Sequence, residues 1–182
     1  PVTLELATAE KQMGKLLAAL AALKDTQLIF TLPNADTDGR ALINMVEKFV
    51  ALHTNARAYA SLGQLRYLSC IAQVDGVVGN SSSGLAEVPS FKKGTINIGD
   101  RQRGRLQAES VINCEPTCES IAAALAQLYS VDFQRSLHQV TNPYGEGGAS
   151  EKVVSTLKNT VIAGIVKKAF YDLSINSNSG RK

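Results

Sequence analysis

Apolar residues recur along this chain with two alternating periods, one typical of helices and one typical of buried strands. Over residues 13–23, leucines and a methionine return every three or four positions, which is the spacing of an amphipathic helix. The next segment, residues 27–32, is mostly apolar and ends at Pro33, as a short buried strand does. This alternation continues almost to the end of the chain, so we expect helices and strands to alternate.

Short connections separate the expected elements. Strands are expected at residues 27–32, 56–59, 76–79, 95–98 and 110–113. Helices are expected behind Thr8 as N-cap, from near Asp38, over residues 65–74, from Gly84 until Pro89 interrupts, from the N-cap Thr117 to Leu128, and over residues 150–169. Strands that alternate with helices predict right-handed βαβ units, and therefore an α/β fold with a parallel sheet covered by helices.

The composition is that of one folded domain. The chain has 182 residues, of which 45% are hydrophobic and 19% charged, so it can bury a core. We expect one domain over residues 1–173 and a disordered or vector-derived tail over residues 174–182, which is rich in Ser and Asn. The start at Pro1 predicts a processed or excised piece. Neither a membrane span nor a signal peptide is recognisable.

The net charge bears on nucleic-acid binding, and the cysteines bear on the cellular compartment. The net charge of +3 is too small to indicate nucleic-acid binding. Three cysteines, Cys70, Cys114 and Cys118, form no CxxC pair, which favours free thiols and a cytoplasmic location. His53 and His138 lack spaced partners, and no carboxylates cluster. We therefore expect neither a metal ion nor a cofactor.

Three segments after expected strands carry candidate chemistry. In open parallel sheets, ligands bind at the carboxyl ends of the strands. Residues 79–84, Gly-Asn-Ser-Ser-Ser-Gly, join a strand to a helix, where free N–H groups and the helix dipole favour an anion. The same serines also suit a capped turn that binds nothing.

Glu87 and an arginine-rich segment supply the other two candidates. The Glu87 carboxylate can accept two hydrogen bonds from a ribose diol, or it can simply face its own helix dipole. Residues 99–105 carry Arg101, Arg103 and Arg105 directly after a strand. Guanidinium groups bind phosphate in a bidentate manner, although a solvated basic loop would have the same composition.

Taken in order, these segments resemble the hydrolysing branch of the UDP-N-acetylglucosamine 2-epimerase family. The resemblance rests on the runs at 78–84, 87–91 and 97–102, together with the segments 33–36 and 142–147. It extends from residue 1 to about residue 173 and matches the C-terminal half of the family. One departure is Glu146, where the family more often has Asp.

The resemblance implies one half of a glycosyltransferase-B-type fold, with the active site between two Rossmann-like halves. By residue, it implies that Ser81 and Ser82 meet the diphosphate, that Glu87 binds the ribose and that Arg101 lies near the phosphates. Tyr67 falls near an aromatic position of the uracil pocket, and a core aromatic would fit that position as well. The catalytic residues are expected in the other half, so none is named here.

The implied reaction eliminates UDP from UDP-N-acetylglucosamine or a related UDP-sugar, then adds water to give N-acetylmannosamine. The donor-binding half of a glycosyltransferase, or a UDP-sugar sensor without activity, would use the same nucleotide site. The expected partners are the UDP-sugar and the protein's own N-terminal domain. Whether the protein assembles as a homo-oligomer, and which sugar it prefers, stay open.

Overall fold

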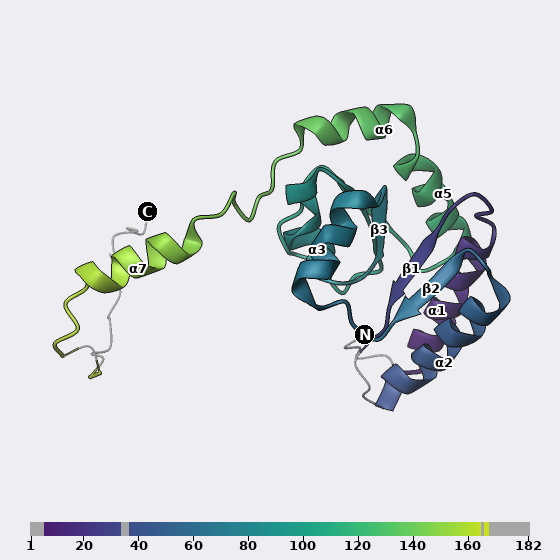
Figure 1. Ribbon diagram of the computed structural model, residues 1–182, viewed down its shortest axis with the longest axis horizontal. Helices are drawn as coiled ribbons and strands as arrows, with labels where there is room; N and C mark the ends of the chain where they lie inside the picture. The colour runs from purple at the N-terminus through teal and green to yellow at the C-terminus, as the bar shows by residue number, and fades with distance from the viewer. Residues whose placement is uncertain (1–5, 34–36, 165, 168–182) are drawn as a thin grey trace, which may run out of the picture. The chain divides into compact units, whose positions relative to one another are not determined.

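The computed structural model describes residues 6–33, 37–164, 166 and 167 (Figure 1). It divides into two compact units, Pro1–Glu146 and Gly147–Lys182, which are described separately. Every strand of the described residues lies in the first unit. The boundary expected at residue 173 and the tail expected over 174–182 lie outside the described residues.

All five expected strands are present, each within one residue of its expected bounds. They are β1 (Leu28–Thr31), β2 (Ala56–Tyr59), β3 (Gly76–Gly79), β4 (Gly94–Ile98) and β5 (Val111–Cys114). Every pairing is parallel, as expected: β1 pairs with β2, and β4 lies between β3 and β5. Among the described residues the strands form a two-stranded and a three-stranded sheet, and no ladder links the two. They share one hydrophobic core instead, which includes Ala56 of β2 and Ile96 of β4.

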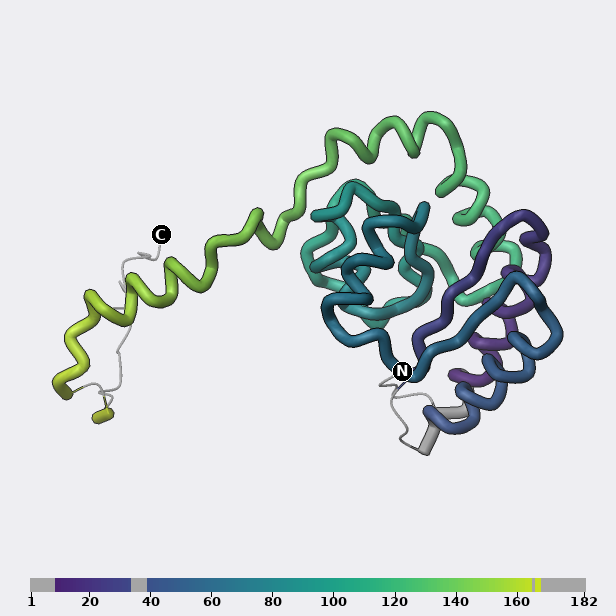
Figure 2. The backbone as a smooth tube through the Cα atoms, viewed as in Figure 1, coloured from purple at the N-terminus to yellow at the C-terminus, as the bar shows by residue number. Residues whose placement is uncertain are grey.

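Helices follow the expected alternation with the strands. They are α1 (Leu6–Ala21), α2 (Thr37–Leu52), α3 (Gly63–Gln73), α4 (Ser83–Ala86), α5 (Cys118–Leu128), α6 (Val131–Ser136) and α7 (Ala149–Asn159), with 3-10 turns η1 (Val88–Phe91) and η2 (Leu137–Gln139). Leu20 of α1, Phe49 of α2 and Leu125 of α5 fill the same core as the strands. Helix α1 packs against both α2 and α5, and Figure 2 shows α1 and α2 side by side. The helical spacing of apolar residues is therefore confirmed as a core-facing pattern.

Some helix ends differ from expectation. The Thr117 cap is confirmed, because its Oγ1 accepts a hydrogen bond from Ser120 N at 3.2 Å. The Thr8 cap is wrong, since α1 begins at Leu6 and includes Thr8. The last helix ends at Asn159 rather than at residue 169. The backbone becomes extended at Thr160, and the β-branched residues that follow disfavour a helix. The short elements α6 and η2 were not expected, because so few residues show no clear period.

Replacing Gly94 at the start of β4 is expected to disturb the core. In Gly94→Ala, a Cβ would lie 2.3 Å from Leu128 Cδ1 and 2.9 Å from Phe133 Cε1. Overpacking of this kind costs about 1–3 kcal/mol of unfolding free energy. In the control Gly14→Ala, the Cβ meets only Met45 Cε at 3.8 Å, and the helix gains up to about 1 kcal/mol. Urea unfolding measures both variants, and equal midpoints would contradict this packing.

Candidate functional site

A cavity of about 410 Å³ opens at the carboxyl ends of β1 and β2. This is the edge of a parallel sheet at which ligands usually bind, and the volume suits a small organic group. Three segments form its walls: the end of β1, the loop after β2 with the start of α3, and the residue after α4. The lining residues are Thr31, Leu32, Ala60, Ser61, Leu62, Gly63, Gln64, Tyr67 and Glu87.

The serine loop, residues 80–84, follows β3 and leads into α4. Ser81 and Ser82 are exposed, and their N–H groups have no acceptor among the described residues. Ser81 Oγ accepts a hydrogen bond from Ser83 N at 3.3 Å, whereas Ser82 Oγ makes no capping bond. Helix α4 spans four residues, so its dipole is smaller than the strand-to-helix pattern implied. Free N–H groups and hydroxyls are what this loop offers to an anion.

Tyr67 connects the cavity to the serine loop. From α3, its Oη lies 2.6 Å from Ser83 Oγ, so the two hydroxyls are hydrogen-bonded. Burial raises the pKa of the Tyr67 phenol; the Ser83 hydrogen bond lowers it and the Glu87 charge raises it further. The phenol therefore stays protonated at neutral pH and can act as a donor. Tyr67 and Glu87 also line the same cavity, which places the two predicted residues together.

The arginine loop, residues 99–105, approaches the serine loop from β4. Arg101 Nη1 donates to Asn80 O at 3.2 Å and lies 3.5 Å from Asn80 Oδ1. Arg103 and Arg105 are exposed and make no side-chain hydrogen bond among the described residues. Of the three arginines, Arg101 is the one whose side chain contacts the serine loop among the described residues.

Gln102 also contacts the serine loop, although the sequence did not single it out. Its side chain is 2% exposed, and Nε2 donates to Asn80 O at 2.7 Å. The sequence offered little signal for this contact, because glutamines are usually exposed and attention goes to the flanking arginines.

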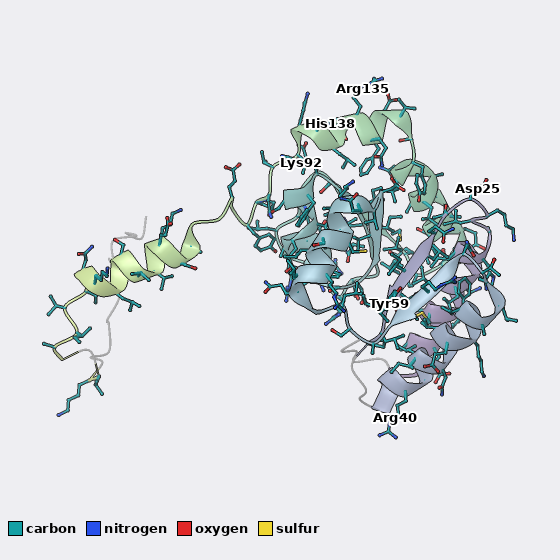
Figure 3. The ribbon with its side chains drawn as sticks, in the orientation of Figure 1. Asp25, Arg40, Tyr59, Lys92, Arg135 and His138 are labelled. Atoms are coloured by element: carbon teal, nitrogen blue, oxygen red, sulfur yellow. The ribbon has the colours of Figure 1, made fainter. Side chains whose placement is uncertain are left out.

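Residues 140–144 make hydrogen bonds to segments next to the serine loop and the arginine loop. Asn142 Nδ2 donates to Ala86 O at 2.8 Å and to Ser90 Oγ at 2.7 Å, which fixes the segment after α4. Tyr144 Oη donates to Leu106 O at 3.1 Å, just beyond the arginine loop. Lys92, labelled in Figure 3, donates to the Val140 carbonyl. Sequence resemblance pointed to this segment, and the structure gives it a supporting role.

The predicted site residues therefore gather around the serine loop and the adjoining cavity. Ser81 and Ser82 lie on the loop, Tyr67 and Arg101 bond to its residues, and Glu87 shares the cavity with Tyr67. Residues 34–36 of the expected turn lie outside the described residues. Among the described residues, no three His, Cys, Asp or Glu side chains are grouped to hold a metal ion, and no helix is long and apolar enough to cross a bilayer.

The chain is similar to known proteins over most of its length. The sequence profile described as UDP-N-acetylglucosamine 2-epimerase matches residues 1–158. The chain belongs to the UDP-N-acetylglucosamine 2-epimerase family. The GDP/UDP-N,N'-diacetylbacillosamine 2-epimerase (hydrolyzing) of Campylobacter jejuni is 37% identical over 95% of this chain and 45% of that protein. The polysialic acid biosynthesis protein P7 of Escherichia coli is 35% identical over 95% of this chain and 44% of its own length.

Two solved structures share the fold of this chain. A complex of S. aureus MnaA with UDP has a TM-score of 0.67 at 19% identity, covering 81% of this chain and 40% of that one. The Neisseria meningitidis UDP-GlcNAc 2-epimerase bound to UDP-GlcNAc has a TM-score of 0.62 at 17% identity, covering 84% and 41%. The Rossmann-like fold is thereby confirmed. The chain spans less than half the length of the curated relatives it matches.

Proposed function

We propose that this chain is the nucleotide-sugar-binding half of a hydrolysing UDP-N-acetylglucosamine 2-epimerase. The observation that carries the proposal is the meeting of three features at one edge of the fold: the serine loop, Arg101 and the cavity that contains Tyr67 and Glu87. Membership of the family, and relatives whose names include the word hydrolyzing, support the same activity.

Each part of UDP has a proposed partner in this site. The diphosphate accepts hydrogen bonds from the free N–H groups of Ser81 and Ser82 and from their hydroxyls, while Arg101 supplies positive charge. The Glu87 carboxylate accepts hydrogen bonds from the ribose diol. Tyr67 borders the space for the uracil, where the cavity gives an apolar wall beside polar loop groups.

The proposed chemistry takes place at C1 and C2 of the sugar. A base removes the C2 proton while the C1–O bond breaks, which releases UDP and leaves a glycal. Water then adds its oxygen to C1, and a proton returns to the opposite face of C2, which inverts that centre. Because the departing diphosphate gains negative charge, a donor fixed beside it lowers the barrier by about 3–4 kcal/mol when well placed.

The rest of the protein supplies what this half lacks. We propose an N-terminal Rossmann-like half that carries the acid and base, in a glycosyltransferase-B arrangement. Its action in the cytoplasm is supported by three cysteines that are free thiols, as reducing compartments favour. A role in making sialic acid or a related nonulosonic acid is supported by the relative named for polysialic acid biosynthesis.

Incubation of the intact protein with UDP-N-acetylglucosamine and no acceptor tests the proposal. We expect UDP and N-acetylmannosamine to form in equal amounts. Chromatography measures the UDP, and proton NMR identifies the sugar. The UDP-linked N,N'-diacetylbacillosamine named for two relatives is assayed in parallel, because their names favour it as a second sugar. Turnover that needs an added acceptor would indicate a glycosyltransferase, and binding without turnover of either sugar would indicate a sensor.

A further inference from the structure

Two side chains of the arginine loop converge on a single carbonyl of the serine loop. Gln102 Nε2 donates to Asn80 O at 2.7 Å, and Arg101 Nη1 donates to the same oxygen at 3.2 Å. The two donors differ in setting, because the Gln102 side chain is 2% exposed whereas Arg101 is exposed. The shorter hydrogen bond therefore comes from Gln102, the buried side chain, which has less conformational freedom than Arg101.

The peptide bond links this carbonyl to the N–H of Ser81. In a trans peptide, C=O and N–H lie in one plane and point in opposite directions. Holding Asn80 O against the buried Gln102 thus turns the Ser81 N–H away from Gln102. That N–H has no acceptor among the described residues, and the Ser81 side chain is exposed. The fixed carbonyl and the free N–H are two ends of one rigid unit.

Burial makes Gln102 a persistent anchor. Its Oε1 is buried without a partner among the described residues, so Nε2 makes the only side-chain hydrogen bond found for it there. Losing that bond would leave the whole buried amide unsatisfied, which is costly. Both hydrogen bonds of Arg101 come from Nη1, and its Nη2 and Nε make none among the described residues. Arg101 is also exposed, so it can turn toward an anion while Gln102 keeps Asn80 O in place.

We propose that Gln102 is a positioning residue for nucleotide binding: through Asn80 O it aims the Ser81 N–H at the diphosphate, and it leaves Arg101 free to contact the ligand. This assignment rests on the proposed diphosphate site in the serine loop. It predicts an effect on the diphosphate that is absent for the nucleoside, because uridine lacks the group at which Ser81 N–H points.

The variant Gln102→Met tests the role, since it fills a similar volume without a donor. By calorimetry, UDP binding should weaken by about fivefold, the loss expected for one neutral hydrogen bond, while uridine binding changes by less than about twofold. The matched control is Gln107→Met, which removes a side-chain amide bonded to Asn113 Nδ2 rather than to the serine loop. It should leave both affinities within about twofold of the unsubstituted chain.

A measurement without ligand tests independently whether Gln102 fixes the Ser81 N–H. In 15N relaxation experiments, the Ser81 amide should become more mobile in Gln102→Met and stay rigid in Gln107→Met. Equal losses for UDP and uridine, unchanged UDP affinity, or an equally rigid Ser81 amide would overturn the positioning role. If the unsubstituted chain binds no UDP, the proposed function fails, while Ser81 mobility still decides whether Gln102 fixes the peptide.

Discussion

Glu87→Ala is expected to weaken UDP binding by about tenfold or more. A charge-assisted hydrogen bond contributes about 1.5–3 kcal/mol, and about 1.4 kcal/mol corresponds to a factor of ten in affinity. Glu87 lines the cavity beside Tyr67, at the place proposed for the ribose, and its carboxylate can accept from both hydroxyls of the diol. Titration calorimetry of the intact protein with UDP gives the dissociation constant.

The ribose assignment has a ligand control and a protein control. The 2',3'-dideoxy analogue of UDP has no diol, so its affinity should change little in Glu87→Ala. Glu47→Ala removes an exposed carboxylate from α2 that lines no part of the cavity, and it should leave UDP binding unchanged. Equal losses of UDP and of the dideoxy analogue would remove Glu87 from this role and point to a general effect on the serine loop.

Most of the strands were predictable because they are short, mostly apolar runs bounded by turn residues, whereas β2 contains Arg57 and is the weakest case. Strand β4, for example, is buried at all five positions, and no helical period competes with that run. The Thr117 cap was predictable because a threonine just before a helix often accepts a hydrogen bond from its first turn, although the same rule placed the start of α1 wrongly at Thr8. The helix ends at Leu6 and Asn159 depend on weaker preferences, and sequence patterns locate such ends poorly.

The residues of the proposed site could be named from the sequence, whereas the contacts between them could not. Ser81, Ser82, Glu87 and Arg101 stand out because their side chains suit anions or diols. Gln102 does not stand out, since its importance comes from burial against Asn80 O, a contact between segments 22 residues apart. The structure also separates Arg101, which donates to Asn80 O, from Arg103, which makes no side-chain hydrogen bond among the described residues, although composition alone presents the two as equivalent.

The 182-residue chain alone is expected to bind UDP weakly and to show no 2-epimerase turnover. The proposed contacts to UDP come from the serine loop, Arg101 and the cavity, all of which lie within the first unit. Proton abstraction from C2 needs a base within about 3 Å of that carbon. Glu87 is the carboxylate that lines the cavity, and its proposed partner is the ribose. The chain covers 45% of its Campylobacter jejuni relative, and we propose that the base lies in the part of the protein outside residues 1–182.

A coupled assay for UDP release, run on this chain and on the intact protein at equal concentration, measures the difference. The intact protein should turn over at ordinary enzyme rates, on the order of 1 per second or above, while the chain alone stays at the background of the assay. In the proposed two-half arrangement, closure over the sugar would also exclude water from the departing diphosphate, which one half alone would not do. Turnover near 1 per second by the chain alone would show that the base lies within residues 1–182 and that the second half is dispensable for the chemistry. UDP binding by the chain without turnover would instead separate nucleotide recognition from proton transfer, as the proposed division between the two halves requires.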